Sequence, residues 1–199
     1  MARDSNHSHL RGRIAHLAAR LMAEDGIEDY ALAKRKAARQ AGAPDSRHMP
    51  DNDEIDAALK TYRDLYQQDH ASHLRELRLL ALKLMSEFTA FNPHLTGSIL
   101  RGSAGKYAGA HLHLYTDNAK NVEHYLLNQG IDFRCGAIRL YAGELALDAP
   151  VYSFEREGVE VNLTVLSMRE LRSQLKASAT GRPIERARLE VVEAMVGAD

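Results

Sequence analysis

The chain has 199 residues, of which 45% are hydrophobic, with 26 Lys and Arg residues against 27 Asp and Glu residues. A net charge of −1 argues against recruitment of nucleic acid or anionic membrane by a field over the whole molecule. The single cysteine, Cys135, excludes an intramolecular disulfide and a zinc site built mainly from thiolates, and we expect it to fill the core. No apolar run reaches the length of a membrane span, and the N-terminus has no apolar signal segment. We therefore expect a cytoplasmic protein with no membrane partner.

Residues 8–91 carry apolar side chains at the spacing of three to four residues that is typical of helices. The sequence predicts four helices in chain order: one that starts at Asn6 or Ser8 and ends at Gly26, one over 29–40, one that starts at Asn52 or Asp53, and one over 72–91. We assign residues 1–71 to a helical N-terminal extension and residues 72–199 to an α/β domain with a C-terminal helix.

After Pro93 the apolar period changes from about 3.6 to 2 residues. The predicted strands are 94–100, 110–116, 131–135, 150–155 and 159–166, and the predicted helices are 118–129, 168–177 and 184–196. The order strand, strand, helix, strand predicts an α+β fold with a mixed sheet flanked by helices.

A segment rich in glycine follows the first of these strands. Glycine lets the backbone approach a phosphate closely, and nearby cations supply charge. We expect Gly97 to have a backbone conformation or a close contact that a Cβ would obstruct. The spacing differs from that of the P-loop and from Gly-x-Gly-x-x-Gly, which argues against a P-loop kinase and a dinucleotide-binding domain. The expected phosphate-binding residues are Gly97, Ser98, Arg101, Gly102, Ser103 and Lys106, although Arg101 and Lys106 are equally explained as solubilising loop residues.

Residues 72–177 resemble the nucleotidyltransferase superfamily, which has the DNA polymerase β-like or minimal nucleotidyltransferase fold. In that family a Gly-Ser turn, often followed by Arg-Gly, precedes a strand that bears Asp-x-Asp, and a later strand bears a third acidic residue. Gly97-Ser98 and Arg101-Gly102 match the turn. The resemblance implies a mixed sheet of nucleotidyltransferase type that binds a nucleoside triphosphate with a divalent metal ion, Mg²⁺, Mn²⁺ or Zn²⁺.

The carboxylates of the family are replaced in this chain. By hydrophobic pattern His111 and His113 take the Asp-x-Asp positions, whereas strict spacing from Gly97 places the pair on Gly109 and His111. Asn162 or Glu160 takes the third acidic position in the strand that follows Gly158. We expect strands 94–100, 110–116 and 159–166 to be neighbours, with His111, His113 and Asn162 facing a common cleft.

Two readings of this degenerate motif follow. In the first, the protein binds a nucleotide and lacks metal-dependent transfer, because imidazoles are poor ligands for Mg²⁺. In the second, it is an active nucleotidyltransferase that uses His111, His113, Glu160 and Asn162 as catalytic residues with a transition metal. Asp117 could join His111 and His113 as a metal ligand, or it could cap the helix over 118–129. The two histidines are also explained as a polar face of the sheet.

A third reading assigns function to the N-terminal helices. Lys34-Arg35-Lys36 and Arg39 form a basic patch that could contact nucleic acid or another protein. No interleaved aromatic residues accompany the patch, which is equally explained as a solvated helix face. The apolar side chains of these helices are also compatible with a homodimer.

Overall fold

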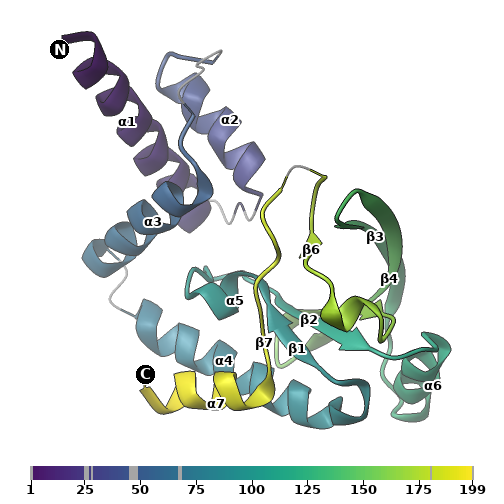
Figure 1. The fold of residues 1–199 in the computed structure, drawn as a ribbon. Helices are drawn as coiled ribbons and strands as arrows, with labels where there is room; N and C mark the ends of the chain where they lie inside the picture. The colour runs from purple at the N-terminus through teal and green to yellow at the C-terminus, as the bar shows by residue number, and fades with distance from the viewer. Residues whose placement is uncertain are drawn as a thin grey trace. The chain divides into compact units, whose positions relative to one another are not determined.

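The computed structural model describes residues 2–24, 27, 29–44, 49–66, 69–179 and 181–198. Backbone contacts divide the chain into two units, and each has buried apolar side chains of its own. Unit 1 comprises Met1–His73 and Ser103–Ala108, and unit 2 comprises Leu74–Gly102 and Gly109–Asp199. The fold is α+β, with seven α-helices in the described residues and a seven-stranded mixed sheet (Figure 1).

Unit 1 is built from helices that pack on α1 (Figure 1). The helices are α1 (Ala2–Glu24), α2 (Tyr30–Gln40) and α3 (Asn52–Tyr66). Their core includes Ile14, Ala37 and Leu59, none of which is exposed. The prediction of a helical N-terminal region is confirmed, but the first helix begins at Ala2, well before the expected caps. Its expected end at Gly26 lies outside the described residues.

The N-terminus of α3 is capped one residue earlier than expected, by Asp51. The Asp51 carboxylate accepts a hydrogen bond from the Glu54 backbone N–H at 2.9 Å, and the Glu54 carboxylate accepts one from the Asp51 backbone N–H at 2.7 Å. This reciprocal pair is a capping box, which satisfies amide groups that the helix itself cannot bond. The predicted cap, Asn52 or Asp53, is therefore corrected to Asp51, and the helix itself begins at Asn52.

Unit 2 contains the sheet, in the strand order β6-β3-β4-β5-β2-β1-β7. The strands are β1 (His94–Thr96), β2 (Ala110–Tyr115), β3 (Arg134–Ala142), β4 (Leu145–Arg156), β5 (Val159–Leu166), β6 (Leu175–Lys176) and β7 (Arg186–Ala187). β2 and β5 pair in parallel, and the other pairs are antiparallel.

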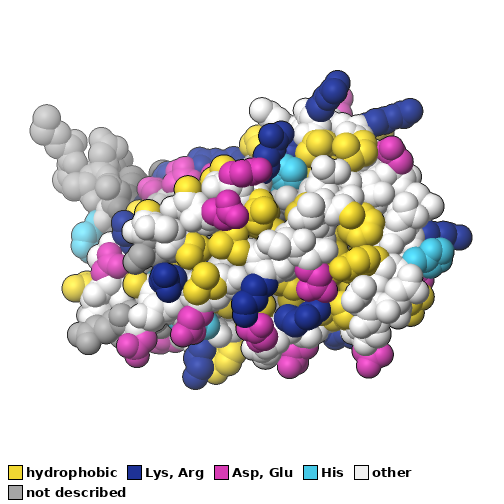
Figure 2. All heavy atoms as spheres, turned by 90° about the horizontal axis from the view of Figure 1, so that it is seen from below, with side chains coloured by type: hydrophobic (Ala, Val, Ile, Leu, Met, Phe, Trp, Pro, Cys, Tyr) yellow, Lys and Arg dark blue, Asp and Glu magenta, His cyan; other side chains and the backbone are white. Residues whose placement is uncertain are grey.

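The helices assigned to unit 2 are α4 (His70–Glu87, whose first turn belongs to unit 1), α5 (Gly97–Arg101), α6 (Lys120–Asn128) and α7 (Leu189–Ala198), with 3-10 turns η1 (Thr89–Phe91) and η2 (Glu170–Arg172). Figure 2 shows the molecule from the side on which α4 and α7 lie, where charged side chains interrupt the hydrophobic ones. None of the helices in the described part of the chain combines the length and the apolar composition that a membrane crossing needs.

Two predicted strand regions differ from the structure. The strand predicted over 94–100 ends at Thr96, because Gly97 has φ of 77° and turns the chain into α5. The short strands predicted over 131–135 and 150–155 are parts of one long hairpin, β3–β4, which turns at Gly143 with φ of 66°. Cys135 lies on the exposed part of β3, so its expected place in the core is wrong.

The helices predicted near the C-terminus also differ. Residues 168–177 form η2 and β6, and the helix predicted over 184–196 begins only at Leu189. Arg186–Ala187 instead pairs with β1 as the edge strand β7. The Arg186 guanidinium donates to Tyr115 Oη at 2.6 Å and to the Leu171 carbonyl at 2.7 Å. These bonds hold the segment extended along the sheet.

Candidate functional site

The sheet brings the predicted motif residues to one face. Along the ladder β1-β2-β5, Thr96 is paired with His111 and His111 with Asn162, and His113 is paired with Thr164 one step further along. Side chains of directly paired residues point to the same side of a sheet, as do residues two apart on a strand. The expectation that the three strands are neighbours is confirmed, and the register places His111, His113 and Asn162 on one face. The common cleft stays a prediction.

Two of the motif residues, His111 and Asn162, lie close to Gly109. A Cβ on Gly109 would lie 3.6 Å from Asn162 Nδ2 and 3.7 Å from His111 Nε2. It would also lie 3.0 Å from the backbone oxygen of Glu160, which is tighter than nearly all real Cβ contacts. A side chain at position 109 would therefore press on the backbone of β5.

His113, two residues after His111 on β2, is buried. Its side chain is only 5% exposed, and its Nδ1 atom has no hydrogen-bond partner among the described residues. Burial lowers the pKa of His113 to about 4, and the positive charges of Arg186, His94 and His111 act in the same direction. The imidazole is thus neutral near pH 7 and covered by protein.

Gly97 has the special backbone conformation expected of it. Its φ is 77°, and a Cβ there would lie 3.4 Å from His111 Cδ2. The Gly-Ser turn thus passes directly over the His111 ring. Gly102, with φ of 75°, ends α5 in the left-handed conformation that glycine adopts most easily.

The expected phosphate-binding residues are divided between the two units. Gly97, Ser98, Arg101 and Gly102 belong to unit 2, with Ser98 half-buried and Arg101 exposed. Ser103 and Lys106 belong to unit 1. Lys106 Nζ lies 5.5 Å from the centre of the Tyr107 ring.

Glu160 and Asn162 have partners that sequence reasoning missed. Arg134 on β3 forms an ion pair with Glu160 at 2.6 Å, and the Ser153 hydroxyl on β4 donates to Asn162 Oδ1 at 2.6 Å. The second bond fixes the amide so that Nδ2 points away from β4 and toward Gly109. Neither partner could be found from the motif, since each comes from the β3–β4 hairpin.

Asp117 does not cap α6, whose N-cap residue is Ala119, and its role as a metal ligand stays a prediction. It is exposed beyond the end of β2, and it is Asn118 whose side chain accepts a bond from the Lys120 amide at the start of α6, at 3.1 Å. Among the described residues no group of three His, Cys, Asp or Glu side chains is placed to hold a metal ion, His111, His113 and Asp117 included.

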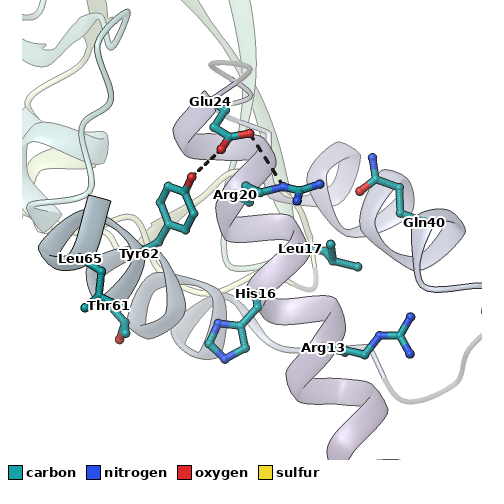
Figure 3. A pocket seen from close by; sticks show the side chains of 9 residues that line it. All are labelled: Arg13, His16, Leu17, Arg20, Glu24, Gln40, Thr61, Tyr62 and Leu65. Atoms are coloured by element: carbon teal, nitrogen blue, oxygen red, sulfur yellow. Dashed lines mark hydrogen bonds and ion pairs between the residues drawn. The ribbon is translucent and has the colours of Figure 1, made fainter. Parts of the chain in front are cut away.

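Unit 1 carries a separate groove of about 680 Å³ over α1. Figure 3 shows Arg13 and Arg20 on either side of Leu17, all three on the side of α1 that faces Gln40 of α2. Arg20 lies 3.8 Å from Glu24, which also accepts the Tyr62 hydroxyl. The groove is thus cationic and apolar at once. The basic patch on α2 is exposed at Arg35, Lys36 and Arg39, and its contact with nucleic acid stays a prediction.

Comparison with known proteins adds no relative: neither a family model nor a curated protein sequence matches the chain.

Proposed function

We propose that unit 2 binds a nucleotide through its phosphates beside the Gly97-Ser98 turn and does not transfer the nucleotidyl group by a two-metal mechanism. The observation that carries this proposal is the meeting of Gly109, His111 and Asn162 at one point of the sheet. The position of β1, β2 and β5 as neighbours in one mixed sheet supports the proposal. The side chains beside Gly109 differ from the carboxylates of the nucleotidyltransferase family.

The shortage of negative charge near His111 and Asn162 argues against a two-metal mechanism. Two divalent ions about 4 Å apart repel each other strongly unless negative ligands surround them. The motif positions supply a glycine, an imidazole and an amide, and the nearby Glu160 carboxylate already pairs with Arg134. An imidazole N–H, the Asn162 amide and the Ser98 hydroxyl can instead donate hydrogen bonds to phosphate oxygens. We therefore expect binding that needs no metal ion.

The test measures nucleotide binding and transfer in the same preparation. We expect nucleoside triphosphates to bind equally well with and without Mg²⁺ in calorimetry, and to label no protein, RNA or small-molecule acceptor. His111→Ala should weaken binding about tenfold, the equivalent of one lost hydrogen bond to a charged group. His124→Ala, at an exposed position on α6, is the control and should bind as the wild type does. Transfer by the wild type that disappears in His111→Ala would overturn the proposal in favour of an enzyme with unusual metal ligands.

A further inference from the structure

We propose that unit 1 contains a second anion site, in which a phosphate group binds to the buried guanidinium of Arg63 beneath the segment Ser103–Ala108. The site goes beyond the nucleotide-binding function proposed for unit 2, and none of its residues belongs to the sheet.

The first observation is an arginine buried without hydrogen-bond partners. Arg63 on α3 is 2% exposed, and its Nε and Nη1 atoms are buried with no hydrogen-bond partner among the described residues. Burial lowers the pKa of Arg63 to about 10, so the side chain stays charged near pH 7. A buried charge without partners is costly, and an anion that bonds to both nitrogens would remove that cost.

The acidic groups nearby do not supply these bonds. The charges of Tyr30 and Asp56 favour the protonated form of Arg63, but neither forms a hydrogen bond or ion pair with it in the described residues. The Asp56 carboxylate accepts the Tyr30 hydroxyl instead. The guanidinium donors therefore remain available for a planar pair of oxygens, the geometry in which arginine binds phosphate.

The second observation is the segment that lies on this guanidinium. A Cβ on Gly105 would be 3.3 Å from Arg63 Nη2, so the segment lies directly on the guanidinium and a side chain here would press on it. The carbonyl of Ala104, whose side chain is fully buried, lies 2.9 Å from His70 Nε2, which ties the segment to the start of α4. Lys106 follows with a further positive charge. Glycine, backbone amides and cations together are the usual composition of a phosphate site.

The phosphate would reach Arg63 when this segment lifts. The segment is bordered by Gly102, whose positive φ suits a hinge, and by Gly109. Closure over the bound anion would exclude water and strengthen the charge-assisted bonds, as lids over phosphate sites do. The ligand class is a phosphate group, either free or carried by a nucleotide, and the experiment separates these sources.

The test compares the melting temperature of the full chain in chloride and in phosphate at equal ionic strength. We expect saturable stabilisation of the wild type by inorganic phosphate, on the order of 2–4 °C. Arg63→Met should lose this response and should melt at a higher temperature than the wild type in chloride, because a buried charge is replaced by an apolar chain. Arg13→Met, at an exposed arginine of the same unit, is the matched control and should keep the response.

Two further measurements make the outcome decisive. Hydrogen exchange of the wild type should slow over residues 103–108 when phosphate is added, and this readout does not depend on any variant folding. A response to ATP but not to phosphate that disappears in Arg63→Met would identify a nucleotide as the source and support the site. Phosphate stabilisation that is as large in Arg63→Met as in the wild type, or exchange over 103–108 that neither phosphate nor ATP slows, would overturn it. His111→Ala should leave the phosphate response intact, which separates this site from the one proposed in unit 2.

Discussion

By strict spacing from Gly97, the resemblance to nucleotidyltransferases implies an acidic residue at the position of Gly109. A Cβ there would lie 3.0 Å from the backbone oxygen of Glu160, which is tighter than nearly all real Cβ contacts. An aspartate at this position would therefore require the backbone of β5 to shift.

Gly109→Asp should accordingly destabilise the fold by on the order of 1–3 kcal/mol, the range for forcing extra atoms into packed structure. It should create no Mg²⁺-dependent stabilisation. Gly136→Asp is the matched control, since a Cβ at Gly136 meets nothing closer than 4.0 Å and the residue is exposed on β3. Urea unfolding with and without Mg²⁺ measures both effects. A Gly109→Asp protein that is stabilised by Mg²⁺ would contradict this account of the site.

His113 makes the stability of unit 2 dependent on pH. Its pKa is about 4 in the folded protein, below the ordinary 6.5, chiefly because of burial. As the pH falls below 6.5 the unfolded chain takes up the proton first, so the free energy of unfolding falls between pH 6.5 and 4, by up to about 3 kcal/mol from this residue. Burial also lowers the pKa of His94, which acts in the same direction in unit 2, and the pKa of His70, which does so in unit 1.

His113→Leu should flatten this dependence in denaturant unfolding followed from pH 7 to pH 4. His124→Gln, a change at an exposed histidine, should leave the slope unchanged. Equal slopes in the wild type and His113→Leu would show that the loss of stability comes from other groups.

The residues of the candidate site could be predicted only in part. Gly97 carries a clear signal, because a Gly-Ser pair after a strand indicates a turn with unusual dihedral angles. The choice between Gly109 and His113 as the partner of His111 has no such signal, since each lies two residues from His111 in the sequence. Gly109 precedes β2, and His113 lies within it. Burial of His113 and the contact of Gly109 with Glu160 arise from neighbouring strands that are distant in the sequence.

At the scale of elements, the capping box of α3 offers a direct test. Asp51→Ala removes the acceptor for the Glu54 amide and should lower the free energy of unfolding by about 1 kcal/mol. Asp51→Asn should retain most of the stability, because asparagine caps helices as well as aspartate does. Lys60→Ala, at an exposed position of the same helix, is the control. If Asp51→Asn is as unstable as Asp51→Ala, the exposed ion pair of Asp51 with Arg11 stabilises the junction, and the cap does not.

The elements that the sequence predicts well are those with a complete internal pattern. The helix over residues 30–40 has an aspartate cap and buried alanines at regular spacing, and β5 alternates between apolar and polar side chains. The β3–β4 hairpin was underestimated because much of β3 is exposed on both faces and so lacks alternation. β6 and β7 have two residues each and exist only through pairing with strands elsewhere in the chain.

At the scale of the whole molecule, the α+β class follows from the change of apolar period after Pro93, which the sequence shows plainly. The membership of Ser103–Ala108 in the helical unit cannot be predicted in the same way, because its glycine and its lysine are equally suited to a loop beside the sheet. The chain passes from unit 2 into unit 1 for these six residues and then returns. The composition of the segment does not indicate this.

The return of residues 103–108 to unit 1 limits how the gene for this protein can be divided. A gene fragment that ends after residue 73 would encode α1, α2 and α3 without the six residues that lie on Arg63, and a fragment that begins there would carry those residues away from their helices. Neither half is a module that recombination can move intact by a single crossover. A division of the chain at residue 73 would therefore separate residues that pack together in unit 1.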